Sequence, residues 1–297
     1  MNAATISPAG YDDNFLELPL QLPAPHKGII TRELSYTHFT VLLEPVRRLA
    51  LVTGVNIDGD QLVDVDRGDD WHFDSRIPIN EQTGEAVYAK NDLDRGHLVR
   101  RRDPVWGDAA TARQANADSF AYTNAAPQAG AFNQSKELWL GLEDHVLTYA
   151  RTNEHRISVF TAPVLSIEDP VYRGTGIPQS FWKIAAWTTT MNGSTVLRSA
   201  GFVLDQSPQL ADIDLDDAGR RALIDGTPPP LGPYRTYQVP VVDIAVLTGL
   251  NLTVLAEADV LAPLPTIRDD AGPRELWVEL PEISEVRLEP QPDRLPA

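Results

Sequence analysis

The residues best able to do chemistry lie between positions 92 and 103, in the run Asp-Leu-Asp-Arg-Gly-His-Leu-Val-Arg-Arg-Arg-Asp. His97 is near its centre, and an imidazole with an ordinary pKa of about 6.5 can take a proton from water at neutral pH. Arg95 precedes it and Arg100 to Arg102 follow, with no acid between. Guanidinium groups bind phosphate through paired hydrogen bonds. A histidine that activates water beside such groups is the chemistry of phosphodiester cleavage.

These twelve residues alone fit a solvated surface histidine equally well. Residues 66–68 repeat the letters Asp-Arg-Gly and are followed by Asp69 instead of histidine, so three shared letters carry little weight. Gly96 lets the backbone turn or lets a phosphate come close. The interpretation therefore depends on whether residues elsewhere in the chain belong with His97.

Four short motifs follow one another at compatible spacing. They are residues 94–97 (Asp-Arg-Gly-His), residues 123–128 (Thr-Asn-Ala-Ala-Pro-Gln), Asn133-Gln134 and Leu142-Glu143. This ordered set resembles the DNA/RNA non-specific endonuclease family, the endonuclease G-like ββα-metal nucleases. The motifs cover about residues 92–145, and a weaker likeness extends over residues 36–260. The resemblance implies an α+β fold of the ββα-metal type, with a central antiparallel sheet flanked by helices.

The resemblance also implies a metal site. In the family pattern His97 is the general base, and Asn133 is the protein ligand of one Mg²⁺, for which Mn²⁺ can substitute. Glu143 would hold water molecules bound to the metal. The asparagine and this glutamate are usually eight positions apart in the family, but here they are ten apart. Two more residues rotate a helical side chain by about 200°, so Glu137 is the alternative.

Further roles follow from the same resemblance. Arg95 is expected to contact phosphate, and Arg76 matches an upstream arginine that stabilises the transition state. Asn124 is expected among the substrate-binding residues, where its hydrogen bonds fix the loop. Arg100 and Arg101 form either a surface that follows the phosphate backbone or a solvated face, and both interpretations stay open.

The implied function is a magnesium-dependent endonuclease of low sequence specificity that hydrolyses DNA and RNA and leaves 5′-phosphate ends. Two alternatives stay open. One is a metal-dependent phosphodiesterase that acts on small substrates. The other is an inactive member of the fold that binds nucleic acid or protein. Motifs of serine hydrolases, zinc peptidases and phosphate-binding loops are absent from the sequence.

Composition is compatible with a globular enzyme of one or two domains. The 297 residues are 42% hydrophobic, and the absence of cysteine excludes disulfides and thiolate chemistry. A net charge of −17 opposes nucleic-acid binding. The stretch 71–113 is nevertheless neutral, with seven basic and seven acidic residues. A locally positive site on an acidic body is expected, with affinity that falls steeply in salt.

Neither a signal peptide nor an apolar span is recognisable, so a soluble cytoplasmic protein without membrane contact is expected. We expect an extended N-terminal arm at residues 1–30, an endonuclease domain at 31–262 and a proline-rich acidic extension at 263–297. The sequence has no feature that indicates an oligomeric state. Hydrophobic patterning predicts strands at residues 36–44, 49–57, 86–89, 157–161, 181–190 and 196–205, helices at 108–118, 134–149 and 241–248, and a loop at 119–133. His97 is expected on a loop that follows the strand at 86–89.

Overall fold

Runs rich in β-branched and aromatic residues form the central sheet, because such side chains pack well on a pleated surface. The computed structural model describes residues 9–25, 28–90, 93–129, 148, 156–207, 210, 235–261, 277–280 and 285–288. Within these residues one antiparallel sheet has eight strands in the order β14-β12-β11-β10-β7-β4-β3-β2. Their bounds are β2 Arg32–Tyr36, β3 Phe39–Glu44, β4 Leu49–Asp58, β7 Arg156–Pro163, β10 Ser180–Met191, β11 Ser194–Asp205, β12 Arg235–Val239 and β14 Val278–Glu279.

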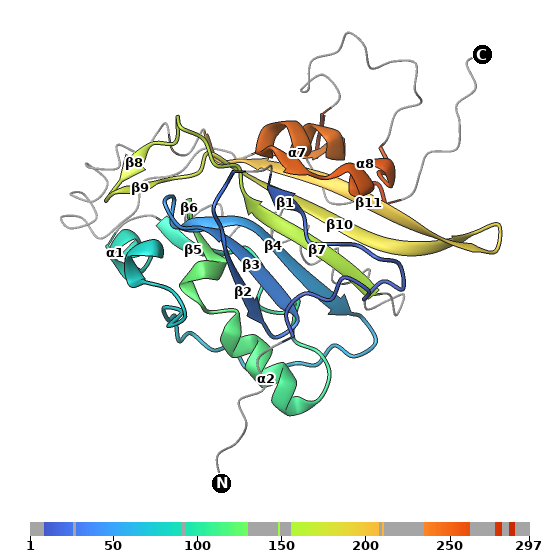
Figure 1. The fold of residues 1–297 in the computed structure, drawn as a ribbon, viewed down its shortest axis with the longest axis horizontal. Helices are drawn as coiled ribbons and strands as arrows, with labels where there is room; N and C mark the ends of the chain where they lie inside the picture. Colours follow the sequence, from blue (N-terminus) through green and yellow to red (C-terminus); the bar gives the residue numbers. More distant parts are fainter. Residues whose placement is uncertain are drawn as a thin grey trace.

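The sheet separates two apolar cores (Figure 1). On one face the alternate residues of the strands pack against the segments that follow β5, with Phe39, Ile57 and Phe202 fully buried. The other face is covered by α7 (Val241–Thr248), α8 (Thr253–Glu257) and N-terminal residues that include Phe15 and Leu16. Because strand residues alternate between faces, the same strands supply both cores.

The site layer is built on a short two-stranded ribbon outside the main sheet. β5 (Leu93–His97) pairs antiparallel with β6 (Ala125–Ala129), and His97 lies opposite Ala125. Between the two strands the chain forms α2 (Ala109–Asp118) and the short 3-10 helix η2 (Tyr122–Asn124). The remaining elements are β1 (Ala24–Pro25), η1 (Ile79–Glu81), α1 (Glu85–Tyr88), β8 (Val171–Tyr172), β9 (Thr175–Gly176) and β13 (Leu250–Asn251).

The central antiparallel sheet and most of the predicted strands are confirmed. The strands predicted at 49–57, 157–161, 181–190 and 196–205 correspond to β4, β7, β10 and β11, and the helices predicted at 108–118 and 241–248 correspond to α2 and α7. The single strand expected over 36–44 is instead the turn and second strand of a hairpin. His38 has a φ of 66°, which reverses the chain between β2 and β3.

Three local predictions are wrong. Residues 86–89 lie in and directly after the helix α1, and residues 119–133 include β6 where a loop was predicted. His97 is the last residue of a strand and not part of a loop. The helix predicted at 134–149 lies outside the described residues, apart from Thr148.

The described part of the N-terminal arm packs onto the sheet instead of standing away from it. Phe15, Leu16 and Leu20 are buried, and β1 pairs with β13. No helix in the described residues has the length and apolar character needed to span a bilayer.

Candidate active site

The β5–β6 ribbon sets the position of His97. Leu93, Arg95 and His97 alternate along β5, so their side chains leave the ribbon on one face. Directly after the strand, the Leu98 amide donates to the Asn124 carbonyl oxygen at 2.9 Å. The backbone that follows the histidine is thereby tied to η2.

The side chain of Asn124 makes further hydrogen bonds to the segment that follows His97. Its Oδ1 accepts from the Val99 amide at 2.8 Å, and its Nδ2 donates to the carbonyl oxygens of Val99 and Ser119, each at 2.9 Å. The residue is fully buried. The expected hydrogen bonds to the loop are therefore present. The amide is engaged with the backbone, and the substrate-binding role of Asn124 stays a prediction.

The imidazole of His97 is enclosed by aromatic rings. Trp71 lies 4.7 Å from it between centroids, and Phe120 meets it edge-on at 5.1 Å. Trp71 is held there because His72 exchanges backbone hydrogen bonds with Phe120 and Tyr122, at 3.1 and 2.9 Å. The ring of His97 keeps partial exposure. Its Nε2 is buried and has no hydrogen-bond partner among the described residues.

This environment changes the proton affinity of the imidazole. Burial, and then the positive charges of Arg67 and Arg101, lower the pKa of His97 to about 3. The ordinary pKa assumed from the sequence is therefore wrong for the folded protein. A ring with this pKa is neutral throughout the physiological range, which leaves Nε2 able to accept a proton.

Arg67 is a site residue that the sequence reasoning missed. Its neighbour Gly68 lies against the ring that meets His97 edge-on, since a methyl group added at Gly68 would lie 3.4 Å from Phe120. Arg67 is exposed, and within the described part of the chain it has no carboxylate partner. The Asp-Arg-Gly letters treated as uninformative thus lie beside His97. Nothing in the local sequence distinguishes this arginine, because Asp66, Asp69 and Asp70 surround it there.

The arginines after His97 are partly engaged with the protein. Arg101 donates through Nη1 to the Val65 carbonyl oxygen and to Asn116 Oδ1, both at 3.0 Å. Arg102 pairs with the exposed Asp64 at 2.9 Å. Burial, and then Arg67 and the neighbouring arginines, lower the pKa of Arg101. These guanidiniums therefore repel one another in a way that a bound phosphate would relieve.

Arg95 lies on the same face of the ribbon as His97. Its guanidinium carbon is 5.8 Å from the centroid of Trp71 and 5.9 Å from that of Tyr88. Its Nη2 forms an ion pair with Glu85. The side chain remains 30% exposed, so a phosphate can reach it.

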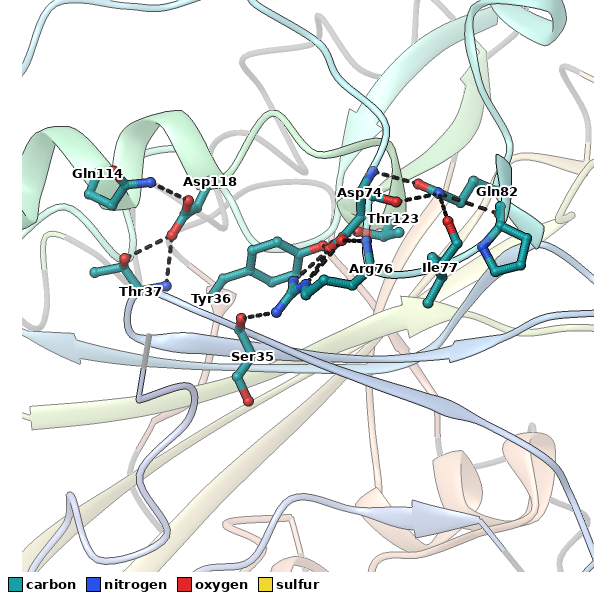
Figure 2. Close-up of polar contacts among 11 residues, drawn as sticks. Ser35, Tyr36, Thr37, Asp74, Arg76, Ile77, Gln82, Gln114, Asp118 and Thr123 are labelled. Carbon is teal, nitrogen blue, oxygen red and sulfur yellow. Dashed lines mark hydrogen bonds and ion pairs between the residues drawn. The ribbon is translucent and has the colours of Figure 1, made fainter. Parts of the chain in front are cut away.

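Arg76 is committed to a structural network, drawn in Figure 2. Its Nη2 pairs with Asp74 Oδ2 at 2.5 Å, and its Nη1 donates to the Ser35 carbonyl oxygen at 2.7 Å. Asp74 also accepts from the Tyr36 hydroxyl at 2.5 Å, and that hydroxyl contacts Thr123 Oγ1 at 2.7 Å. Burial raises the pKa of Asp74, but the hydrogen bonds from Arg76 and Tyr36 outweigh it and the net pKa is lowered. The expected transition-state contact of Arg76 stays a prediction, and its guanidinium is already engaged with Asp74 and Ser35.

Gly96 has a packing role that the sequence did not suggest. It does not have a positive φ, so it makes no turn. A methyl group at this position would lie 2.0 Å from the side-chain carbon Cδ of Gln128. Gln128 is buried, and neither atom of its amide has a hydrogen-bond partner in the described residues.

Comparison with known proteins agrees with this arrangement. The family model described as DNA/RNA non-specific endonuclease matches residues 23–258. The chain belongs to the DNA/RNA non-specific endonuclease family. The match covers the sheet apart from β14, the β5–β6 ribbon and the described residues around His97.

Two similar proteins are informative. The uncharacterized protein y4fB of Sinorhizobium fredii (strain NBRC 101917 / NGR234) is 37% identical over 269 residues, covering 81% of this chain. The chain spans only 38% of that protein's length. The crystal structure of the EndoG/EndoGI complex, which concerns the mechanism of EndoG inhibition, matches with a TM-score of 0.51 and 18% identity. That match covers 74% of this chain and 85% of the other, and it shows the same α+β ββα-metal fold.

The metal-binding residues expected for this endonuclease family, Asn133, Glu143 and Glu137, lie outside the described residues. Among the residues that are described, no three His, Asp or Glu side chains gather into a group that could hold a metal ion. The buried Nε2 of the neutral His97 ring has no hydrogen-bond partner among the described residues. A hydrated Mg²⁺, which keeps several water molecules as donors, fits beside such an atom.

Proposed function

We propose that this chain hydrolyses internal phosphodiester bonds of DNA and RNA without sequence specificity, with Mg²⁺, or Mn²⁺ in its place, as cofactor. One observation carries the proposal. A neutral imidazole with an unpaired Nε2 lies in the field of Arg67 and Arg101. This combination supplies a proton acceptor and a place for an anionic phosphate.

In the proposed reaction His97 Nε2 takes a proton from a water molecule. The oxygen of that water attacks phosphorus and forms a new P–O bond, and the bond to the 3′ oxygen breaks. The leaving oxygen takes a proton from solvent. The products are a 5′-phosphate and a 3′-hydroxyl, which conserves atoms and charge.

Substrate binding would also make His97 a stronger base. The charges of Arg67 and Arg101 contribute to its low pKa. A phosphate between these groups offsets part of that charge, so the pKa of the imidazole rises when substrate is present. The base is then most effective in the complex that needs it.

Arg67 and Arg95 are the proposed phosphate contacts. Arg67 is exposed and has no carboxylate partner in the described part of the chain, and Arg95 is partly exposed on the face of the ribbon that carries His97. Asn133 would hold the Mg²⁺, with Glu143 or Glu137 nearby. When bound, that ion offsets the negative charge that grows on the phosphate oxygens.

Plasmid nicking tests the proposal. The wild-type chain should relax supercoiled plasmid with Mg²⁺ and should lose this activity in excess chelator. His97→Ala should reduce the rate by about 10²-fold or more, the scale of losing a general base, while the protein stays folded by circular dichroism.

An intact plasmid beside cleavage of a small phosphodiester would instead favour the phosphodiesterase alternative. Equal activity of wild type and variant would overturn the mechanism.

Two arginine substitutions separate the sequence-based assignment from the structure-based one. Arg67→Ala should lower the rate of nicking much more than Arg76→Ala does once both proteins are compared at equal folded fraction. The reason is that Arg76 is already bonded to Asp74 and Ser35. A larger loss of nicking rate in Arg76→Ala than in Arg67→Ala would indicate that Arg76 contacts the phosphate.

A further inference from the structure

Glu85 contacts the motif arginine but has no part in the reaction described above. Its Oε2 accepts a hydrogen bond from Arg95 Nη2 and a second one, at 3.1 Å, from the Tyr122 hydroxyl. The hydrogen bond from Arg95 is the main cause of the lowered pKa of Glu85, so the carboxylate is ionised. The side chain is 54% exposed, so burial does not account for its position.

The backbone that carries Glu85 is anchored from a distant part of the chain. Arg173 donates through Nη1 to the carbonyl oxygens of Ala86 and Ala89, each at 2.7 Å, at the end of α1. A positive charge is favourable there because the last carbonyl groups of a helix lack partners. Arg173 thus holds the short helix from outside.

Arg173 is itself held in an unusual conformation. It lies in the turn between β8 and β9 with a φ of 48°, followed by Gly174 with a φ of 75°. A non-glycine residue with positive φ is uncommon and carries a conformational cost. Arg48 fixes this turn by donating to the Gly174 carbonyl oxygen and to Thr175 Oγ1.

The first residue before α1 is fixed by close packing. A methyl group added at Gly84 would lie 2.2 Å from the ring of Phe73. Behind the helix, Val87, Tyr88, Leu93, Tyr122, Tyr172, Ile177 and Leu210 form a small separate core. Glu85 therefore meets Arg95 at a place determined by packing on one side and by Arg173 on the other.

We propose that Glu85 is a positioning residue that orients the guanidinium of Arg95 toward the substrate phosphate, and that Arg173 keeps Glu85 in place through α1. The inference rests on the proposed nuclease function. Among the described residues, the other neighbours of the guanidinium are the flat faces of Trp71 and Tyr88 and the Tyr122 hydroxyl, which donates to the same oxygen of Glu85. Ring faces do not fix the rotation of the guanidinium, so the ion pair with Glu85 is the contact that orients it. A donor must point to where charge develops in the transition state. Loss of Glu85 should therefore lower kcat more than it changes KM.

The test compares steady-state cleavage of a labelled oligonucleotide by wild type, Glu85→Gln, Glu85→Ala, Arg173→Lys and Arg173→Ala. Glu81→Gln is the matched control, because Glu81 pairs with Arg32 at the surface at 2.9 Å. The Glu85 variants should lose about tenfold or more in kcat with KM changed by less than about threefold, on the scale of a misplaced catalytic group. Glu81→Gln should match wild type.

The Arg173 variants distinguish positioning from direct phosphate binding. Lysine keeps the charge, but its side chain is shorter than that of arginine, so its ammonium group does not reach the position from which Nη1 makes both contacts. Both Arg173 variants should therefore lower kcat at nearly unchanged KM. A loss confined to KM that lysine restores would overturn the positioning role of Arg173.

Two results would overturn the role of Glu85. One is an unchanged kcat in Glu85→Gln, and the other is a lower KM, which would make the carboxylate a competitor of the phosphate. Wild type and His97→Ala are measured in the same series. Activity in wild type with loss in His97→Ala keeps the nuclease function, so an unaffected Glu85→Gln would then refute this inference alone. An inactive wild type would overturn both.

Discussion

At the scale of single residues, the surroundings of His97 determine both its protonation state and the positive charge beside it. Aromatic rings and nearby arginines keep the imidazole neutral, and a neutral ring is the form that accepts a proton. In the proposed reaction the same arginines would attract the anionic substrate. Their charge would weaken the base only until a phosphate is bound.

The low pKa of His97 predicts acid sensitivity. The folded-state pKa is about 3 and the unfolded value is about 6.5, so between these pH values the unfolded chain binds more protons. Above about pH 6.5 the imidazole is neutral in both states and does not change the free energy of unfolding. As the pH falls from 6.5 toward 3, protonation of the unfolded chain lowers the free energy of unfolding. By pH 5 the loss is about 2 kcal/mol. In urea unfolding between pH 7.5 and 5, the free energy of unfolding of His97→Gln should fall by about 2 kcal/mol less than that of wild type.

A suitable control for that comparison is His72→Gln, because His72 lies at the surface. Its stability should follow the pH dependence of wild type. Parallel curves for wild type and His97→Gln would show that His97 is protonated in the folded state, contrary to the structure.

At the scale of elements, the β5–β6 ribbon and the β2–β3 turn place the site against the sheet. The ribbon needs a residue without a side chain opposite Ala126, because Gln128 occupies the space over Gly96. Tyr36 is the last residue of β2, and its hydroxyl bonds to Asp74 and to Thr123, which lies directly before Asn124 (Figure 2). Neither contact joins residues that are close in sequence.

Gly96→Ala should destabilise the ribbon. The added methyl group meets Gln128, and overpacking of a buried site costs about 1–3 kcal/mol. Gln128→Ala in the same chain should restore most of the thermal stability, since it removes the side chain that clashes. Differential scanning fluorimetry of the two single variants and the double variant measures this. A double variant no more stable than Gly96→Ala would place the strain in the backbone.

The Tyr36 hydroxyl should be energetically coupled to Thr123. Tyr36→Phe removes the hydroxyl that bonds to both Asp74 and Thr123 in a buried site, and losing such hydrogen bonds costs about 1–3 kcal/mol. With Thr123→Val, a double-mutant cycle in urea should give a coupling energy of about 0.5 kcal/mol or more. Tyr36→Phe combined with Thr248→Val is the additive control, because Thr248 bonds to Ile244 in a different element. Additivity in both cycles would contradict the network.

At the scale of the whole molecule, an acidic body carries a locally positive site. The net charge is −17, yet Arg67, Arg95 and Arg101 lie together around His97. Binding should therefore depend on a few local contacts and should weaken steeply as salt screens them.

The salt dependence of binding should reveal the contribution of Arg67. Each phosphate contact adds about 0.9 to the magnitude of the slope of log K against log salt for duplex DNA. Arg67→Gln should reduce that magnitude by about one, in fluorescence anisotropy with chelator present to prevent cleavage. Arg32→Gln, in which the lost charge was paired with Glu81, should leave the slope unchanged. Equal slopes for Arg67→Gln and wild type would remove Arg67 from the interface.

The sequence by itself determined the family and the strands β4, β7, β10 and β11, and it singled out His97 as the candidate general base. These follow from local patterning and from motif letters, which need no knowledge of distant contacts. Residues 86–89 were misassigned because a short apolar run fits strand and helix equally well. Only its packing over Leu93 and Tyr122 decides for the helix α1.

Only the tertiary structure decided which charged groups act together. Arg67 and Arg76 look equivalent as letters, but Arg76 meets Asp74 and Arg67 meets no carboxylate in the described residues. Likewise Glu85 and Arg173 become relevant only when folding brings α1 and the β8–β9 turn to Arg95. A charge acts through the groups around it in space, and a linear pattern does not contain those distances.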